Sequence, residues 1–144
     1  MLRQGPIPLT VHALLDPIVG VLLIASPFLF GFSDQGAPTA VAIVVGLIVL
    51  LVGMSTAWRL SLVDVIPLLA HAFIDVLVAV ALIASPFLFG FSDEGTPTGL
   101  FIGLGVADLL FTLGTRWRPA PGAPTGRPRR STSRRPPPGA QPTA

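Results

Sequence analysis

The chain has 144 residues, of which 51% are hydrophobic and only 11% are charged, and its mean hydropathy is +0.78. A soluble domain of this size needs far more polar surface to cover itself, so the composition excludes an ordinary soluble globular protein and indicates a lipid environment. The sequence has no cysteine, which excludes disulfides, thiolate metal sites and cysteine catalysis.

Four apolar segments follow one another along the chain, at residues 8–32, 38–58, 67–91 and 97–117. Each has about the ~20 residues that a helix needs to cross a ~30 Å hydrocarbon core. A backbone in lipid must satisfy its own polar groups, so these segments are predicted to be transmembrane helices. A proline stands at or near each predicted start, where its missing N–H is tolerated.

An internal repeat groups the four segments into two units. Residues 24–34 (Ile-Ala-Ser-Pro-Phe-Leu-Phe-Gly-Phe-Ser-Asp) recur letter for letter at 83–93, and the flanking sequence keeps the same offset. Glycine-containing turns at 33–36 and 92–95 then join the two spans of each unit. The predicted fold is therefore an all-α membrane protein of four transmembrane helices, arranged as two tandem helical hairpins. Since each unit has an even number of spans, the units should be related by a pseudo-twofold axis along the membrane normal.

This repeat predicts four parts of the chain. They are an N-terminal segment at 1–7, a first two-span repeat at 8–59, a second at 60–118, and a basic tail rich in proline and arginine at 119–144. The tail cannot bury enough apolar surface to offset its ordering entropy, so it is predicted to be disordered.

The basic residues predict the orientation of the chain in the membrane. All nine are arginines: Arg3 precedes the first span, Arg59 lies between the second and third, and seven lie at or beyond Arg116. Neither of the turns inside the repeats carries a basic residue. The positive-inside rule therefore predicts a multi-pass protein of the cell (inner) membrane with both termini and the Arg59 connection in the cytoplasm. The pairs Trp58-Arg59 and Trp117-Arg118 are expected to be anchors at the cytoplasmic interface.

Two arginine pairs in the tail, Arg129-Arg130 and Arg134-Arg135, match a surface that contacts anionic lipid. A nucleic-acid patch is the alternative, but no aromatic residue is interleaved with these arginines. We therefore expect anionic lipid, and no nucleic acid, as the partner of the tail.

Two spans per repeat, with Ser-Pro-aromatic near the end of the first, resembles the SPW-repeat family of small prokaryotic integral membrane proteins. The motif is carried here by Ser26-Pro27-Phe28 and Ser85-Pro86-Phe87, with phenylalanine in place of the family's tryptophan in both copies. The resemblance covers residues 8–118 and implies membrane residence and two-span repeats. It implies no established biochemical activity.

The Ser-Pro pairs have a structural interpretation and a functional one. A proline within a helix frees the carbonyl four residues earlier, here Leu23 and Leu82, and the preceding serine can bond a local carbonyl or a neighbouring helix. Two symmetric kinks that let the hairpins pack are the favoured interpretation, and a paired binding mouth is the alternative. Gly46 and Gly105 are likewise predicted to let helices approach closely, and the Gly99-xxx-Gly103 spacing is a weaker signal of the same kind.

Five ionisable residues lie within the predicted spans: His12, Asp16, His71, Asp75 and Asp108. Each histidine stands four residues before an aspartate, so each pair shares one helix face, and the repeat axis can bring both pairs together. Asp108 has no acidic counterpart, because Val49 holds its place in the first repeat, and its expected partner is His71 or Thr112. This cluster can bind a divalent metal, relay protons or hold a cationic substrate, or it can be structural. The structural interpretation is favoured, and no metal or cofactor is predicted.

The sequence favours a non-enzymatic membrane protein of unknown molecular activity, which acts through lipid, self-association or another membrane protein. It contains no catalytic constellation, and an enzyme acting on lipid or quinone is the least favoured class. A homo-oligomer, or a complex with another membrane protein, is a further hypothesis, since four helices make a thin bundle for shielding three acids. The alternative function is a small transporter, or a proton- or cation-coupled module, that uses the five intramembrane polar residues.

Overall fold

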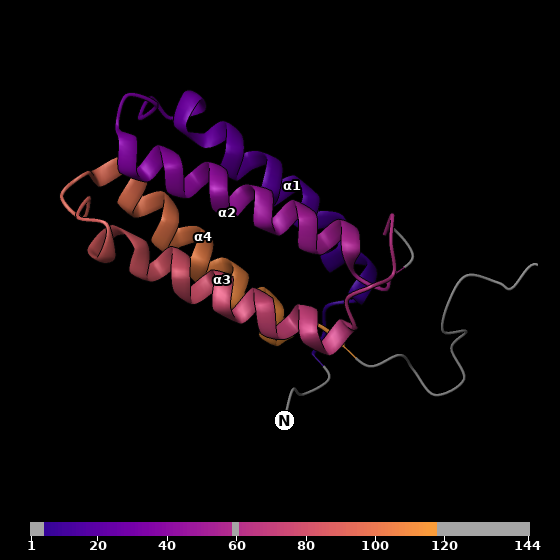
Figure 1. The fold of residues 1–144 in the computed structure, drawn as a ribbon. Helices are drawn as coiled ribbons and strands as arrows, with labels where there is room; N and C mark the ends of the chain where they lie inside the picture. Colours follow the sequence, from indigo (N-terminus) through magenta and orange to yellow (C-terminus); the bar gives the residue numbers. More distant parts are fainter. Residues whose placement is uncertain (1–4, 59–60, 118–144) are drawn as a thin grey trace, which may run out of the picture.

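The structure is a computed structural model that describes residues 5–58 and 61–117. These residues form four helices, α1 (Leu9–Leu29), α2 (Gly36–Ser55), α3 (Leu68–Leu88) and α4 (Gly95–Gly114). Helix α1 packs mainly against α2, and α3 packs mainly against α4 (Figure 1). The predicted all-α fold of two tandem hairpins is therefore confirmed. The predicted tail, Arg59 and Arg118 lie outside the described residues.

All four helices are long and apolar enough to cross a membrane, with mean hydropathies from 1.5 to 2.5. At 20 or 21 residues each, they are about 30 Å long, which equals the thickness of the hydrocarbon core. Large apolar side chains stay exposed on the outside of every helix, as Ile18, Leu51, Leu77 and Leu110 illustrate. Such a surface suits lipid and not water, so the chain is a multi-pass membrane protein.

The two ends of the bundle differ. The turns within the hairpins lie at one end, here called the turn end, and the chain enters and leaves the bundle at the other, the termini end (Figure 1). At the turn end, Phe32 and Phe91 pack edge-on against Phe101, with ring centroids 6.2 and 5.6 Å from it. These buried rings continue the core formed by Leu23 and Leu82.

The serines of the Ser-Pro-Phe motifs satisfy local backbone groups. Ser26 Oγ donates a hydrogen bond to the carbonyl of Leu23 at 2.7 Å. This is the carbonyl that Pro27, which has no N–H, leaves without its helical donor. The second repeat has the same bond from Ser85 to Leu82 at 2.8 Å. Both hydroxyls are therefore used within their own helix, as the structural interpretation requires.

The first helix of each hairpin ends three residues before the predicted boundary. Helix α1 ends at Leu29, where the sequence predicted residue 32. Gly31 adopts a φ of +69°, and the Phe32 N–H donates to the carbonyl of Pro27 at 2.9 Å, which closes the helix with a Schellman motif. The second repeat ends its first helix in the same way. Pro27 thus stands in the last turn of α1, only two residues before the helix ends. The Ser-Pro-Phe motif therefore ends the helix and does not kink it.

At the termini end, each hairpin pairs with the other through the same contact. The residue after α2, Thr56, forms a parallel bridge with Ile66, and the residue after α4, Thr115, forms one with Ile7. The repeat offset carries Thr56 onto Thr115 and Ile7 onto Ile66. The two bridges between the repeats are therefore equivalent. The repeats are related by a pseudo-twofold axis that runs along the bundle.

Gly105 lets α4 lie directly against α3. A Cβ at this position would be 2.7 Å from the carbonyl oxygen of Ala79 and 2.7 Å from Ile83 Cγ1. Gly46 has the equivalent place in the first hairpin, 2.7 Å from the carbonyl oxygen of Gly20. A Cβ at Gly99 would meet nothing within 4 Å, so the weaker signal around Gly99 does not mark a helix contact in the described part of the chain.

We expect Gly105→Ala to destabilise the protein by ~1–3 kcal/mol, because the added methyl group meets a backbone oxygen that cannot rotate away. The measurement is thermal unfolding in detergent, followed by circular dichroism. Gly99→Ala, in the same helix, is the control and should be neutral or slightly stabilising through its better helix propensity. Equal stability of the two variants would contradict the close packing of α4 on α3.

Candidate functional site

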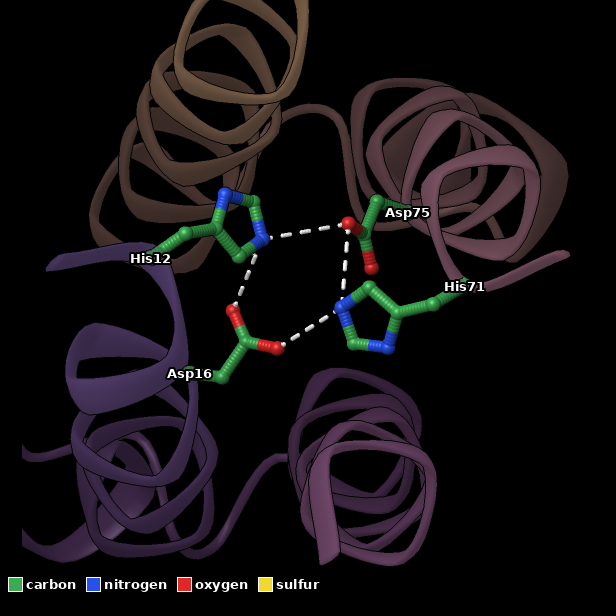
Figure 2. Close-up of side chains that lie close together, drawn as sticks. All are labelled: His12, Asp16, His71 and Asp75. Atoms are coloured by element: carbon green, nitrogen blue, oxygen red, sulfur yellow. Dashed lines mark ion pairs between the residues drawn. The ribbon is translucent and has the colours of Figure 1, made fainter. Parts of the chain in front are cut away.

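Two histidines and two aspartates meet between α1 and α3, and we call them the His–Asp centre (Figure 2). His12 Nε2 lies 3.2 Å from Asp16 Oδ1 and 3.2 Å from Asp75 Oδ2. His71 Nε2 lies 3.0 Å from Asp16 Oδ2 and 3.3 Å from Asp75 Oδ2. Each histidine therefore contacts the aspartate of its own helix and the aspartate of the other repeat. The structure thus brings four of the five predicted ionisable residues into one ring.

The centre is almost enclosed by the protein. The side chains of His12 and His71 are 0% and 1% exposed, and those of Asp16 and Asp75 are 14% and 11% exposed. Ionisable groups within a membrane span are costly unless they find partners. Here α1 and α3 supply those partners to each other. One chain therefore shields Asp16 and Asp75 by itself.

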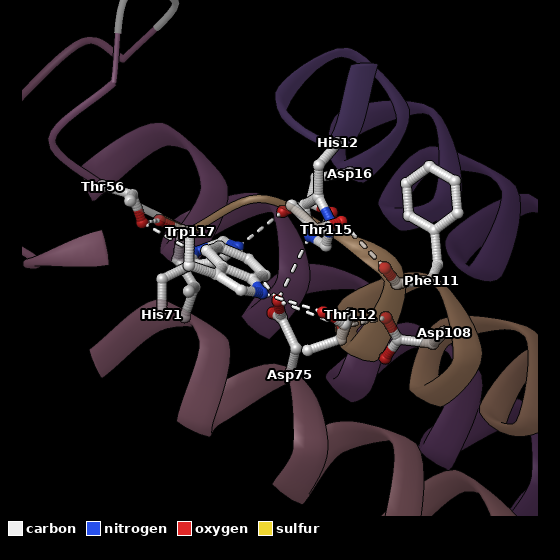
Figure 3. A network of polar contacts seen from close by, with 11 residues as sticks. His12, Asp16, Thr56, His71, Asp75, Asp108, Phe111, Thr112, Thr115 and Trp117 are labelled. Carbon is white, nitrogen blue, oxygen red and sulfur yellow. Dashed lines mark hydrogen bonds and ion pairs between the residues drawn. The ribbon is translucent and has the colours of Figure 1, made fainter. Parts of the chain in front are cut away.

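A threonine fixes the outer nitrogen of each histidine ring (Figure 3). Thr56 Oγ1 donates to the carbonyl of Val52 at 2.6 Å, and the same hydroxyl lies 2.8 Å from His71 Nδ1. A hydroxyl has one proton, and Thr56 uses it in the hydrogen bond to the Val52 carbonyl. His71 Nδ1 must therefore donate its own N–H to the hydroxyl oxygen. In the second repeat, Thr115 Oγ1 likewise donates to the carbonyl of Phe111 at 2.8 Å and lies 3.0 Å from His12 Nδ1. Both rings therefore carry a proton on Nδ1.

The inner nitrogens, His12 Nε2 and His71 Nε2, are left to face the carboxylates. Both atoms are buried, and neither makes a hydrogen bond of acceptable geometry. The carboxylate oxygens lie 3.0 to 3.3 Å away, but none of these contacts meets the geometry of a hydrogen bond. Two buried polar atoms are thus aimed into the centre without an aligned partner, which is uncommon in protein interiors.

Two tryptophans cover the centre at the termini end. The ring centroids of Trp58 and His71 are 4.5 Å apart, and those of Trp117 and His12 are 4.8 Å apart, both edge-on. Trp117 is only 3% exposed, and its indole N–H donates to the carbonyl of Thr112 at 2.8 Å. The tryptophans of the two predicted anchor pairs therefore form a wall of the centre.

Asp108 stands beside the centre and is not part of the ring. The Thr112 hydroxyl lies 3.5 Å from Asp75 Oδ2 and 3.5 Å from Asp108 Oδ1 (Figure 3), which are long contacts that one proton cannot serve together. Of the two partners predicted for Asp108, the structure places Thr112 next to it.

A cavity of about 170 Å³ lies on the turn-end side of the centre. Asp16, Asp75 and Asp108 line it together with apolar side chains. Val49, which the repeat offset relates to Asp108, lines the same cavity. The cavity therefore lies where the pseudo-twofold axis passes, and Asp108 makes one side of it acidic.

Thr56 and Thr115 are the members of the site that the sequence interpretation missed. They stand one residue beyond α2 and α4, as C-caps, where a lone threonine attracts no notice. A signal was nevertheless present, because both stand two residues before a tryptophan at the repeat offset. Two imidazoles and two carboxylates at this spacing are able to hold protons or a metal ion.

The comparisons with known proteins bear on the whole helical bundle. The model of the SPW repeat domain matches residues 10–115, a range that includes His12, Thr115 and every residue of the centre. No curated protein and no solved structure matches the chain. The match covers well over half of the sequence and agrees with the four apolar helices, so the chain belongs to the SPW repeat domain family of membrane proteins.

Proposed function

We propose that the protein is a non-enzymatic membrane protein that handles cations at the His–Asp centre, as a small proton- or cation-coupled module. The observation that carries this proposal is the exchange of partners between the repeats. His12 contacts Asp75, and His71 contacts Asp16, so the two pairs form one joint centre. Packing two apolar hairpins together does not require four ionisable groups in the membrane, where each of them is costly.

The cavity gives the centre an adjoining space that a small cation can occupy. Asp16 and Asp75 line both the ring and the cavity, so a small cation in the cavity is within reach of their oxygens. A purely structural or partner-binding role, which the sequence alone favoured, needs no cavity at this place. Asp108 on the cavity wall adds a third carboxylate that attracts positive charge.

The arginines support a cell-membrane location in which the termini end faces the cytoplasm. In that orientation Trp58 and Trp117 cover the centre on the cytoplasmic side. The tail would then lie against anionic lipid. Because one chain shields Asp16 and Asp75, the proposal needs no second copy, and self-association stays a prediction.

The test is a flux assay with the full-length protein in liposomes, using dyes for protons and for divalent cations. We expect the wild type to pass one of these cations faster than empty liposomes do, and Asp75→Asn to lose most of that flux. Asp93→Asn removes an exposed turn carboxylate and is the matched control, expected to keep the wild-type rate. Wild-type flux equal to that of empty liposomes, or full flux in a folded Asp75→Asn variant, would overturn the proposal.

A further inference from the structure

We propose that the His–Asp centre is a tetrahedral binding site for a divalent transition-metal ion of the zinc class. The four ligands are Nε2 of His12, Nε2 of His71 and one carboxylate oxygen each from Asp16 and Asp75. This inference rests on the proposed function and deepens it, because it names the cation.

The spacing of the four ligand atoms supports a single ion. One atom from each residue can be chosen so that all four lie within 4.8 Å of one another. A tetrahedral zinc ion with nitrogen and oxygen ligands at ~2.0–2.1 Å holds its ligand atoms ~3.4 Å apart. With Asp16 Oδ2 and Asp75 Oδ2 as the two oxygen ligands, three of the four nitrogen–oxygen separations are 3.0 to 3.3 Å, already close to that value. The wider pairs need to approach by no more than ~1.4 Å, which side-chain rotation supplies.

The threonines give both histidines the tautomer that a metal ligand needs. His71 Nδ1 donates to Thr56, and His12 Nδ1 donates to Thr115, so each ring presents Nε2 to the centre. Histidines that bind metals commonly donate their other ring N–H to a fixed acceptor in this way. Each threonine is itself held by a bond to a helix carbonyl, so this support is rigid.

The inner nitrogens provide a second, independent observation. Both Nε2 atoms are buried, point into the ring and have no hydrogen bond of acceptable geometry. A structural ion pair would direct the N–H of each ring at a carboxylate oxygen. Two inner nitrogens that each lie 3.0 to 3.3 Å from carboxylate oxygens, without an aligned hydrogen bond, are instead the arrangement that a metal ion completes.

Charge and ligand type select the class of ion. Two neutral imidazoles and two carboxylates carry a total charge of −2, which one divalent cation neutralises inside the membrane, whereas a monovalent ion leaves a net charge. Imidazole ligands favour zinc and its neighbours over Mg²⁺ and Ca²⁺, which prefer oxygen ligands and higher coordination numbers. Four protein ligands in a tetrahedral arrangement favour zinc among those ions.

The experiment uses the full chain in detergent, without an affinity tag, stripped with a chelator and titrated with Zn²⁺ and with Co²⁺. We expect one ion per chain and the intense visible absorption of tetrahedral Co²⁺. We also expect a saturable change in fluorescence, because the only two tryptophans of the chain flank the two histidines. X-ray absorption of the zinc form should give Zn–N and Zn–O distances of ~2.0–2.1 Å.

His12→Asn and His71→Asn are the decisive variants. The asparagine amide nitrogen can still donate to the threonine that His Nδ1 contacts, while the Nε2 ligand is removed. We expect each variant to bind Zn²⁺ and Co²⁺ more than about tenfold more weakly, since even outer partners of a metal ligand contribute 10–100-fold. Asp34→Asn and Asp93→Asn, in the exposed turns, should bind as the wild type does.

The outcomes separate this inference from the proposed function. If the folded wild type shows no saturable binding of Zn²⁺ or Co²⁺, or if both histidine variants bind normally, the metal site is overturned. Proton flux that depends on Asp75 would in that case leave the proposed function intact. Binding at one ion per chain without flux of metal or protons would instead keep the metal site and overturn the proposed function.

Discussion

The double variant His12→Leu with His71→Leu is expected to lose ~3–5 kcal/mol of stability, because it leaves two carboxylates inside the membrane without their partners. In the wild type, each oxygen that faces the ring lies 3.0 to 3.3 Å from a histidine nitrogen. Removal of both rings leaves the carboxylates of Asp16 and Asp75 next to each other without a histidine partner, and the cavity is the adjoining space into which they can turn. The free energy of unfolding in mixed micelles of detergent and lipid measures the loss.

Replacement of the whole centre is expected to have the opposite effect. When a complete buried ionic group gives way to apolar side chains of similar volume, stability commonly stays equal or rises by ~1–4 kcal/mol. We therefore expect the quadruple variant, with valine also at Asp16 and Asp75, to fold at least as well as the wild type. It should bind no Zn²⁺ and show no cation flux. A quadruple variant less stable than the wild type would contradict this expectation and would make the centre a structural element.

These two variants together separate the two roles that the sequence left open for the polar residues. A structural role requires the ring for stability, whereas a functional role requires that the ring be dispensable for folding and necessary for cation handling. Stability and flux must therefore be measured on the same preparations. Ser26 and Ser85 show what a structural polar group does here, since each satisfies one carbonyl of its own helix.

Most of the fold could be predicted because a lipid environment permits few solutions. The exact repeat indicated two equal units, and the length of the apolar segments indicated membrane-spanning helices. Because each unit has an even number of spans, the two units were expected to be related by a pseudo-twofold axis along the membrane normal. The helix ends could not be predicted as well, because hydropathy continues through Gly31 to Phe32 while the backbone turns at that glycine.

The site could be predicted only in part. The spacing of His12 and Asp16 placed them on one face of α1, but it did not tell which helix that face meets. Only the meeting of side chains from α1 and α3 in the folded bundle shows that each histidine has two carboxylates. The role of Thr56 depends on the chain leaving α2 and running beside the start of α3, which no local pattern of residues encodes.

Thr56→Val and Thr115→Val are expected to show that the threonines orient the histidines. Valine has nearly the shape of threonine but cannot accept the Nδ1–H of the ring, so a buried donor is left unsatisfied at a cost of ~1–3 kcal/mol in each variant. The ring is then free to carry its proton on Nε2, the atom that we assign as the metal ligand. Zn²⁺ affinity should therefore fall by about 10–100-fold in each variant, as for other outer partners of metal ligands.

Thr98→Val provides the matched control for this prediction. Its hydroxyl also donates to a carbonyl, that of Phe91, at 2.8 Å, but at the turn end and away from the His–Asp centre. This variant should lose ~0.5–1.5 kcal/mol of stability and keep its Zn²⁺ affinity. Thr115→Ser, which retains the hydroxyl, should restore both properties at the centre. If Thr115→Val and Thr98→Val had equal Zn²⁺ affinities, the threonines would not set the tautomer, and the histidines would reach the ion without that support.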